Sequence, residues 1–200
     1  MIDWSQQRED VLLMWQDECW FSRFAQPNAH DWGGRYLFER PAKHNEEDKA
    51  LACYGAIRAD NQQMYLAFCA GQPNSDFTIE FIEYMLSEVE KMNSESGCTI
   101  KLLYFIWDHA SWHKSKKLKT WMREHNQLAN KNGNARVAAW LLPKKSPWLN
   151  PIEPRWLHGK RAVCEPGEEK LLPEKLQKRL CSYYQTDFVV LEADHATQLC

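Results

Sequence analysis

The sequence of 200 residues lacks the features that mark several classes of protein. It has no run of eighteen apolar residues, so no membrane-spanning helix is predicted. Its first residues, MIDWSQQRED, show no basic stretch followed by an apolar one, so we expect no signal peptide. There is no internal repeat and no low-complexity tract. These absences indicate one soluble globular domain in the cytoplasm, without a membrane partner.

The cysteine pattern excludes two further classes. Seven cysteines lie scattered along the chain, an odd number, and no CxxC motif occurs. Neither a disulfide framework nor a zinc site built from cysteine pairs is therefore indicated. We predict buried, reduced thiols instead.

The net charge of −2 hides a strongly uneven distribution. Residues 1–112 contain nine Lys and Arg against eighteen Asp and Glu, whereas residues 113–163 contain twelve against two. A compact basic block beside an acidic half is typical of a protein with one face that meets phosphates. A solvated basic helix face balanced by an acidic neighbour is the alternative explanation.

Apolar runs and turn signals predict an α/β fold with strands and helices in alternation. Three runs without alternation indicate strands buried on both faces: residues 11–15, 100–107 and 136–142. A strand pair is expected at residues 50–58 and 63–70, and a short strand at residues 35–38. Helices are expected at residues 75–92, 113–124, 151–164 and 173–184, with a polar loop at residues 125–134.

Three carboxylates follow or begin these elements. Asp17 and Asp108 each come at the end of a predicted buried strand, and Glu153 lies at a predicted helix start after Asn150 and Pro151. Because α/β sheets gather function at the carboxyl ends of their strands, we expect the three side chains to converge. Taken alone, Glu153 fits a helix-capping role equally well.

A set of three carboxylates favours hard cations such as Mg²⁺ or Mn²⁺ over zinc. Such a set would hold two ions roughly 3.5–4 Å apart, which is the arrangement used for phosphoryl transfer. His109 and His113 flank Asp108, but no third His or Cys stands at ligand spacing. We interpret His113 as a residue at a helix start or in contact with phosphate.

Three stretches of the chain resemble one protein family. They are WQDECWF at 15–21, FIWDHASWHKSKKLKTWM at 105–122 and LLPKKSPWLNPIEPRW at 141–156. Together they resemble the catalytic domain of mariner-superfamily DDE transposases, in the bacterial insertion-sequence branch, over roughly residues 10–165. The resemblance implies a ribonuclease-H-like mixed sheet with flanking helices, cleavage of transposon ends and strand transfer into target DNA. It also implies that Asp17 binds both metal ions and that Asp108 and Glu153 bind one each.

The chain departs from the family pattern at three points. The 44 residues between Asp108 and Glu153 exceed the usual spacing, and we assign the excess to the polar loop at 125–134. Pro154 directly follows Glu153, which predicts a later helix start or a displaced Glu153. The family's N-terminal helix-turn-helix region is not found before Asp17, so we expect either that a separately encoded partner supplies it or that the chain is a remnant.

The basic block supplies the expected contacts to the DNA backbone. These residues are Lys114, Lys116, Lys117, Lys144, Lys145, Arg155, Lys160 and Arg161. We expect residues 1–200 to form a single catalytic domain, with 166–200 as a helical extension, which can act as a homodimer. An inactive remnant that binds DNA, or a different ribonuclease-H-like nuclease, are the alternatives.

Overall fold

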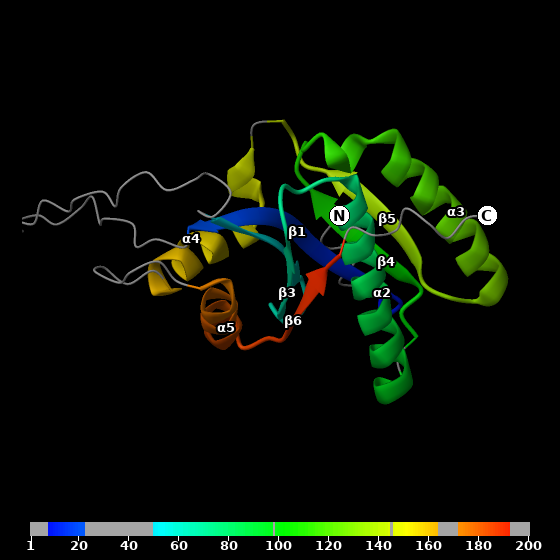
Figure 1. Ribbon diagram of the computed structural model, residues 1–200. Helices are drawn as coiled ribbons and strands as arrows, with labels where there is room; N and C mark the ends of the chain where they lie inside the picture. The colour runs from blue at the N-terminus through cyan, green and yellow to red at the C-terminus, as the bar shows by residue number, and fades with distance from the viewer. Residues whose placement is uncertain (1–7, 23–49, 98, 145, 164–171, 193–200) are drawn as a thin grey trace, which may run out of the picture.

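A single mixed sheet organises the chain in the computed structural model, which describes residues 8–22, 50–97, 99–144, 146–163 and 172–192. Its six strands are β1 (Val11–Ser22), β2 (Ala50–Arg58), β3 (Met64–Cys69), β4 (Leu102–Trp107), β5 (Arg136–Leu141) and β6 (Phe188–Leu191). They lie in the order β5-β4-β1-β2-β3-β6. β1 runs parallel to β4 and antiparallel to β2, which places the longest strand at the centre of the sheet (Figure 1).

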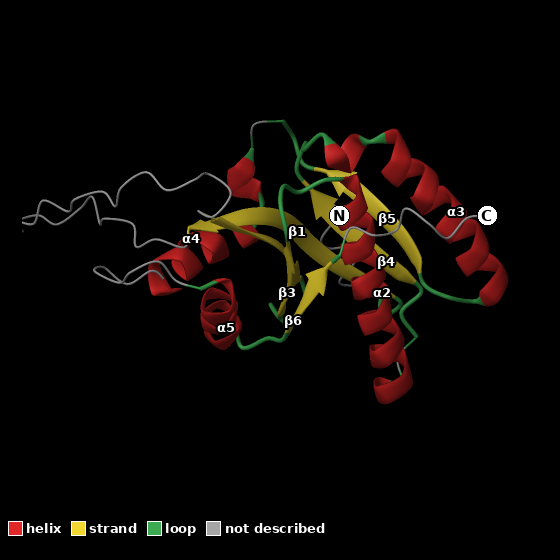
Figure 2. Cartoon of the chain, in the orientation of Figure 1, coloured by secondary structure: helices red, strands yellow, loops and turns green. Residues whose placement is uncertain are grey.

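Helices cover both faces of this sheet (Figure 2). They are α2 (Ser75–Ser96), α3 (Lys116–Asn132), α4 (Ile152–Val163) and α5 (Pro173–Tyr184), with short 3-10 turns η2 (Trp112–Lys114) and η3 (Pro147–Leu149). α2 and α3 pack on one face, and α4 and α5 pack on the other. The expected ribonuclease-H-like mixed sheet with flanking helices is therefore confirmed. No helix within the described ranges is both long and apolar enough to cross a bilayer.

Alternation along β1 divides the core into two parts. Leu12 and Met14 pack with α2 and α3, whereas Leu13 and Trp15 pack with α4 and α5. Every residue from Val11 to Asp17 is buried, as predicted for a strand covered on both faces. Odd and even positions of β1 thus face different helices, and this parity decides where the acidic residues further along the strand point.

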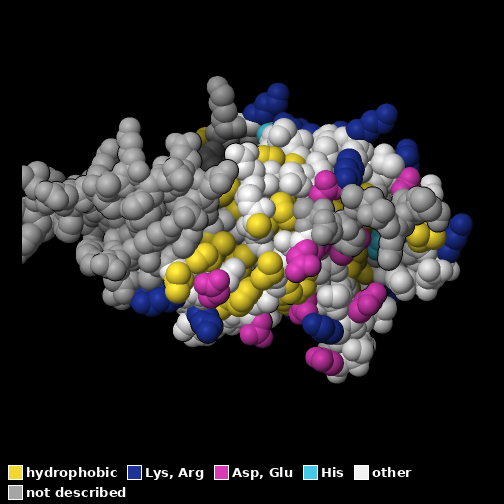
Figure 3. Space-filling model, viewed as in Figure 1, with side chains coloured by type: hydrophobic (Ala, Val, Ile, Leu, Met, Phe, Trp, Pro, Cys, Tyr) yellow, Lys and Arg dark blue, Asp and Glu magenta, His cyan; other side chains and the backbone are white. Residues whose placement is uncertain are grey.

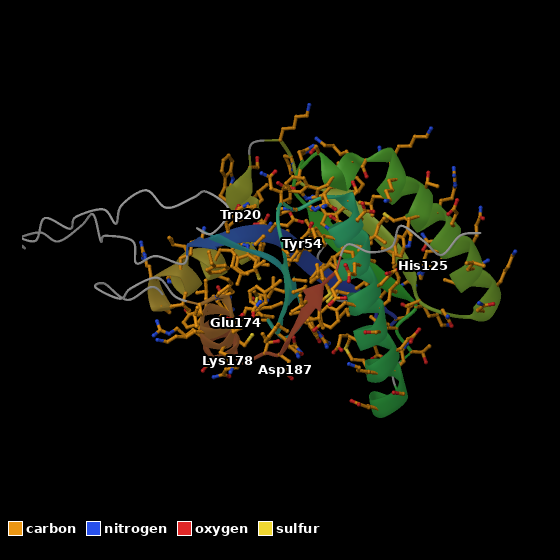
Figure 4. The ribbon with its side chains drawn as sticks, in the orientation of Figure 1. Trp20, Tyr54, His125, Glu174, Lys178 and Asp187 are labelled. Carbon is orange, nitrogen blue, oxygen red and sulfur yellow. The ribbon has the colours of Figure 1, made fainter. Side chains whose placement is uncertain are left out.

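The N-terminal end of α2 is anchored to β2 through a tyrosine. Asn74 caps this helix, because its side chain accepts hydrogen bonds from the N–H groups of Asp76 and Phe77 at 2.8 and 3.1 Å. The hydroxyl of Tyr54 on β2 donates to the carbonyl of Asn74 at 3.1 Å. Figure 4 shows Tyr54 near the middle of the fold, while His125 lies out on α3.

The prediction of a polar loop at residues 125–134 was wrong. α3 continues to Asn132 and ends at Gly133, whose left-handed φ of 76° suits a helix terminus. The side chain of Asn126 holds this extension on the sheet, because it bonds both the N–H and the carbonyl of Val137 on β5 at 2.7 Å. The long interval between Asp108 and Glu153 therefore contains a longer helix rather than a surface loop.

Two strands of the structure, β5 and β6, differ from what the sequence predicted. β5 was predicted to be buried on both faces, but it is an edge strand whose Trp140 remains 53% exposed. β6 was not predicted, and it pairs in parallel with β3, so the region expected to be a helical extension also contributes a strand. The expected strand at residues 35–38 lies outside the described residues.

The buried thiols agree with the prediction where they are described. Cys19, Cys53 and Cys69 are buried and free, and Cys181 is half-buried and free. Burial raises the pKa of the Cys19 thiol to about 11. These groups therefore pack as small apolar side chains.

Candidate active site

The backbone register places two aspartates at the same level of the sheet. The last parallel pair between β1 and β4 is Trp15 with Ile106. Asp17 and Asp108 each follow two residues later on these neighbouring strands. Because β4 ends at Trp107, the carboxyl end of β4 opens directly beside Asp17.

The sequence predicted that Asp17 lies at the end of a strand, but in the structure it lies within β1. β1 continues for five residues beyond it and stays paired with β2, where Asp17 stands opposite Gly55. The antiparallel pairing with β2 thus continues along β1 after the parallel pairing with β4 has stopped. Asp17 is therefore held by backbone pairing on the β2 side and open on the β4 side.

The Asp17 side chain is buried, with only 8% of the residue exposed. It points to the face of α4, whose Trp156 donates its indole N–H to Asp17 Oδ2 at 3.1 Å. Burial, followed by the charges of Glu18, Glu153 and Asp108, raises the pKa of Asp17 to about 8. The crowding of negative charge around Asp17 is the electrostatic condition that a bound cation would relieve.

A buried histidine links Asp108 to a second acidic residue of β1. His113, whose side chain is 0% exposed, donates from Nδ1 to Asp108 Oδ1 at 2.8 Å and from Nε2 to Glu18 Oε1 at 3.1 Å. Glu18 also accepts from the amide of Gln16 at 2.9 Å. The imidazole stacks on the Trp107 ring, with centroids 4.9 Å apart. Residues of β1, of β4 and of the loop after β4 thus meet at the His113 side chain.

The charges of this network support one another. Burial alone would lower the pKa of His113, but its bonds to Asp108 and Glu18 outweigh burial and raise the pKa to about 9. For Asp108, burial acts to raise the pKa, and the bonds from His113 and the Ala110 N–H hold it below its usual value. Of the two interpretations of His113, the structure agrees with a position at a helix start, because His113 lies in η2 just before α3. A phosphate contact is excluded, because the ring is enclosed between two carboxylates.

Glu153 lies on the first turn of α4 and is exposed. It lines, together with Asp108, a cavity of about 360 Å³. The other lining residues are His109, Ala110, Leu142, Pro143, Ser146 and Asn150. Asn150 is buried and caps the helix, since its Oδ1 accepts from the N–H of Ile152 at 3.4 Å.

Pro154 does not delay the helix, contrary to one of the expectations from sequence. α4 begins at Ile152, so Pro154 falls in the first turn, where a missing N–H leaves no intrahelical bond unmade. Glu153 therefore keeps its place at the helix start. The N-terminal end of the helix dipole also favours a carboxylate there.

The donor chemistry of the site fits hard divalent cations. Asp17, Asp108 and Glu153 offer carboxylate oxygens only, and the charges of the other two both raise the pKa of Asp17. Among the described residues, no group of three His, Cys, Asp or Glu side chains is arranged to surround one ion as it stands. The assignment of these three residues as metal ligands stays a prediction.

Comparison with known proteins identifies the family. A model of the family described as DDE superfamily endonuclease matches residues 13–170. The chain belongs to the DDE superfamily endonuclease family. The resemblance noted in the sequence is thereby confirmed at the level of the family, and no curated protein matches the chain.

Solved structures of a transposase share the fold of this DDE family member. A Mos1 mariner paired-end complex with Mn matches with a TM-score of 0.59 at 14% identity, over 92% of this chain and 51% of that one. A Mos1 transposase paired-end complex with the left transposon end matches with a TM-score of 0.56 at 13% identity, over 93% and 52%. The chain thus spans about half the length of the Mos1 chains that it matches.

The basic residues predicted to contact DNA are exposed wherever this DDE chain is described. This holds for Lys114, Lys116, Lys117, Lys144, Arg155, Lys160 and Arg161, while Lys145 lies outside the described residues. Lys117 pairs with Asp76 of α2, and the Lys160 ammonium lies 6.0 Å from the centroid of the Phe21 ring. In Figure 3, several Lys and Arg side chains line the upper and right-hand rim, while in the lower part Asp and Glu side chains lie together with other Lys and Arg side chains. Exposure alone does not show that these residues form one continuous surface, so this DNA interface stays a prediction.

Sequence reasoning missed Glu18 and Trp156 as parts of the site, and it did not foresee the contacts of His113 with two carboxylates. Glu18 follows Asp17 directly and points to the opposite face of β1, where His113 lies. A signal existed for each of the other two residues. His113 comes five residues after Asp108, and Trp156 stands one helical turn after Glu153.

Proposed function

We propose that this chain is the catalytic domain of a mariner-superfamily DNA transposase from a bacterial insertion sequence. It would cleave DNA at transposon ends and transfer the cut strand into target DNA. The observation that carries the proposal is the alignment of Asp17 with Asp108 on neighbouring parallel strands, with Glu153 sharing the cavity of Asp108. Family membership and the shared Mos1 fold support it.

Asp17, Asp108 and Glu153 would hold two Mg²⁺ or Mn²⁺ ions. When bound, such ions polarise the phosphoryl group and favour deprotonation of the attacking water or 3′-hydroxyl. The protein's own part is positioning. Asp108 Oδ1 is occupied by the N–H of Ala110 at 2.9 Å and by His113, which leaves Oδ2 as its oxygen without a hydrogen bond from these groups. Asp17 Oδ2 is bonded to Trp156, which leaves Oδ1 for a ligand.

The basic residues around the site would bind the DNA backbone. Lys114 follows His113 in η2, Lys144 follows the cavity residue Pro143, and Arg155 and Lys160 lie on the helix that bears Glu153. Cations at these places would offset the repulsion between phosphates and the carboxylates. Contacts of this kind position the DNA without reading its sequence.

Recognition of the transposon ends would come from a helix-turn-helix part, and assembly of two copies would bring two ends together. We propose that residues 1–200 form one catalytic unit, because α5 and β6 pack on the same sheet as the carboxylates. The free, buried thiols of Cys19, Cys53 and Cys69 fit a reducing compartment such as the bacterial cytoplasm, close to the nucleoid.

Nicking of supercoiled plasmid DNA in the presence of Mn²⁺ tests the proposed function. Wild-type protein should nick, whereas Asp17→Asn, Asp108→Asn and Glu153→Gln should not. Glu174→Gln, an exposed acidic residue on α5 (Figure 4), is the matched control and should retain activity. If nicking is equal in all five proteins, the site is misassigned. If wild type neither nicks nor gains thermal stability with millimolar Mn²⁺, the chain is a DNA-binding remnant.

A further inference from the structure

Trp156 connects the helix of Glu153 to the strand of Asp17. It lies three residues after Glu153 on α4 and is only 3% exposed. Its indole N–H donates to Asp17 Oδ2 at 3.1 Å, across 139 residues of sequence. A single side chain therefore contacts one carboxylate of the site and shares a helical turn with another.

A glycine on β2 makes this contact sterically feasible. Gly55 stands directly opposite Asp17 in the antiparallel pairing of β1 with β2. A Cβ atom placed on Gly55 would come within 2.5 Å of Trp156 Cζ2, closer than real Cβ atoms approach other groups. The indole ring thus occupies the space that a side chain at position 55 would fill, and from there it reaches Asp17.

The ring is also held from its other sides. Phe21 of β1 meets it edge-on with centroids 5.8 Å apart, and Tyr184 of α5 does so at 6.1 Å. The Tyr184 hydroxyl in turn donates to the carbonyl of Arg155 at 2.7 Å, which fastens α5 to the same turn of α4. Since aromatic packing fixes the plane of the indole, the direction of its N–H is fixed as well.

We propose that Trp156 is a positioning residue for the metal site, and this inference rests on the proposed function. By bonding Oδ2, the indole turns Oδ1 of Asp17 toward the ligand position. By packing over Gly55, it sets the distance between the first turn of α4 and β1, and with it the place of Glu153. Groups that orient metal ligands through hydrogen bonds typically change metal affinity about 10–100-fold when they are removed.

Purified full-length variants test this role through Mn²⁺ binding, measured by electron paramagnetic resonance of the free ion. Trp156→Phe keeps an aromatic ring and removes the N–H, and we expect it to weaken Mn²⁺ binding about tenfold or more. In plasmid nicking, kcat should fall while KM for DNA stays level. Gly55→Ala should weaken Mn²⁺ binding in the same way, because the added methyl displaces the ring.

Trp121→Phe is the matched control, because Trp121 is a partly buried tryptophan packed on the opposite face of the sheet. It should lower the melting temperature without changing Mn²⁺ affinity. If Trp156→Phe does not fold, benzothienylalanine at position 156 replaces only the N–H by sulfur and keeps the ring shape.

The outcomes separate this inference from the proposed function. Mn²⁺ binding by the Trp156→Phe or benzothienylalanine protein equal to that of wild type would overturn the positioning role and leave the proposed function intact. A wild-type protein that binds no Mn²⁺ would overturn both. Weaker Mn²⁺ binding with an unchanged KM for DNA would support the positioning role, since packing alone predicts a change in stability only.

Discussion

The two aspartates and the glutamate of the site are held in different ways. Asp17 and Asp108 are placed by the backbone, through the parallel register in which Trp15 pairs with Ile106. Glu153 is placed by side chains, through the Asn150 cap and the packing of Trp156 against β1 and β2. Backbone ladders tolerate most substitutions, whereas a position set by side-chain packing depends on a few particular residues.

The difference assigns separate tasks to the two regions. The strand pair fixes where the first two carboxylates stand, and the local networks then orient their oxygens. The helix α4 must be docked before its glutamate can complete the set. Changes in the strand region should therefore alter chemistry at a preserved site, while changes around α4 should alter the geometry of the site.

Replacing Asp108 by Asn is the change with the largest expected effect. It keeps the shape of the side chain and removes one anionic ligand, so plasmid nicking with Mn²⁺ should fall by at least about a hundredfold. Relief of repulsion among carboxylates would, by itself, leave stability level or raise it. The structure alters this expectation, because Asp108 is an ionic partner of the buried His113.

We therefore expect metal-free Asp108→Asn protein to be less stable by about 1 kcal/mol, a modest amount because the side chain is 49% exposed. Urea denaturation measures this quantity directly. A variant that is more stable than wild type, with full Mn²⁺ response, would mean that Asp108 neither binds the ion nor anchors His113.

Replacing His113 by Gln should have the next largest effect. The shorter amide cannot bond both Asp108 and Glu18, so Asp108 loses a fixed orientation although the backbone register remains. We expect Mn²⁺ affinity to fall about 10–100-fold, measured by calorimetric titration. His125→Gln on α3 is the control, because that ring bonds the Ala135 carbonyl far from the site and should not affect the metal. Unchanged affinity in His113→Gln would show that the backbone alone orients Asp108.

The same division between backbone and side chains explains what could be predicted from sequence. The strand that carries Asp17 and the strand that leads into Asp108 were recognisable because buried strands form short, unbroken apolar runs. α5 was predicted with its observed bounds, Pro173–Tyr184, because a proline at the first position and an apolar stripe define it. The resemblance to the family then predicted that Asp17 and Asp108 act together with Glu153.

Features that depend on contacts far apart in sequence were missed. The extension of α3 over residues 125–132 looks polar, yet Asn126 bonds β5 and Leu128 and Ala129 continue the helix. β6 is only four residues long and gains its stability from pairing with β3. Likewise, no local pattern shows that Trp156 reaches Asp17 or that Glu18 meets His113, since each contact spans more than ninety residues.

The stability of the metal-free protein should depend on pH through two groups, Asp17 and the His113 that bonds Asp108. Burial and the nearby carboxylates raise the pKa of Asp17 to about 8, and an unfolded aspartate titrates near about 3.9. Because the folded state keeps this proton to higher pH, stability falls as pH rises from about 4 to about 8. Despite its burial, the bonds of His113 to Asp108 and Glu18 raise its pKa to about 9. Its stabilising contribution is complete below its unfolded pKa of about 6.5 and is lost as pH rises through about 9.

The stability of the metal-free fold should therefore fall through both groups as pH rises from about 6.5 to about 8, and through His113 alone from there to about 9. We expect the melting temperature to fall by about 5 °C or more over this interval, since 1 kcal/mol corresponds to about 2–4 °C for a chain of this size. Calorimetry in the presence of a chelator measures the shift. Asp17→Asn removes the aspartate's part and should reduce the slope, and a flat profile for wild type would contradict both assignments.

Single lysines should have the smallest effects, and they extend the comparison to the DNA surface. Lys144 lies on the loop after β5, whereas Lys160 lies on α4, which side-chain packing positions. If each contacts one phosphate, Lys144→Ala and Lys160→Ala should each reduce the salt dependence of DNA binding by about one unit of slope. Lys178→Ala on α5 (Figure 4) is the control and should leave the slope unchanged.

Introducing Gly55→Ala, which displaces α4, should abolish the contribution of Lys160 but not that of Lys144. Titrations of labelled duplex DNA at several salt concentrations test this, and equal losses for both lysines in the Gly55→Ala background would show that α4 is held independently of Trp156.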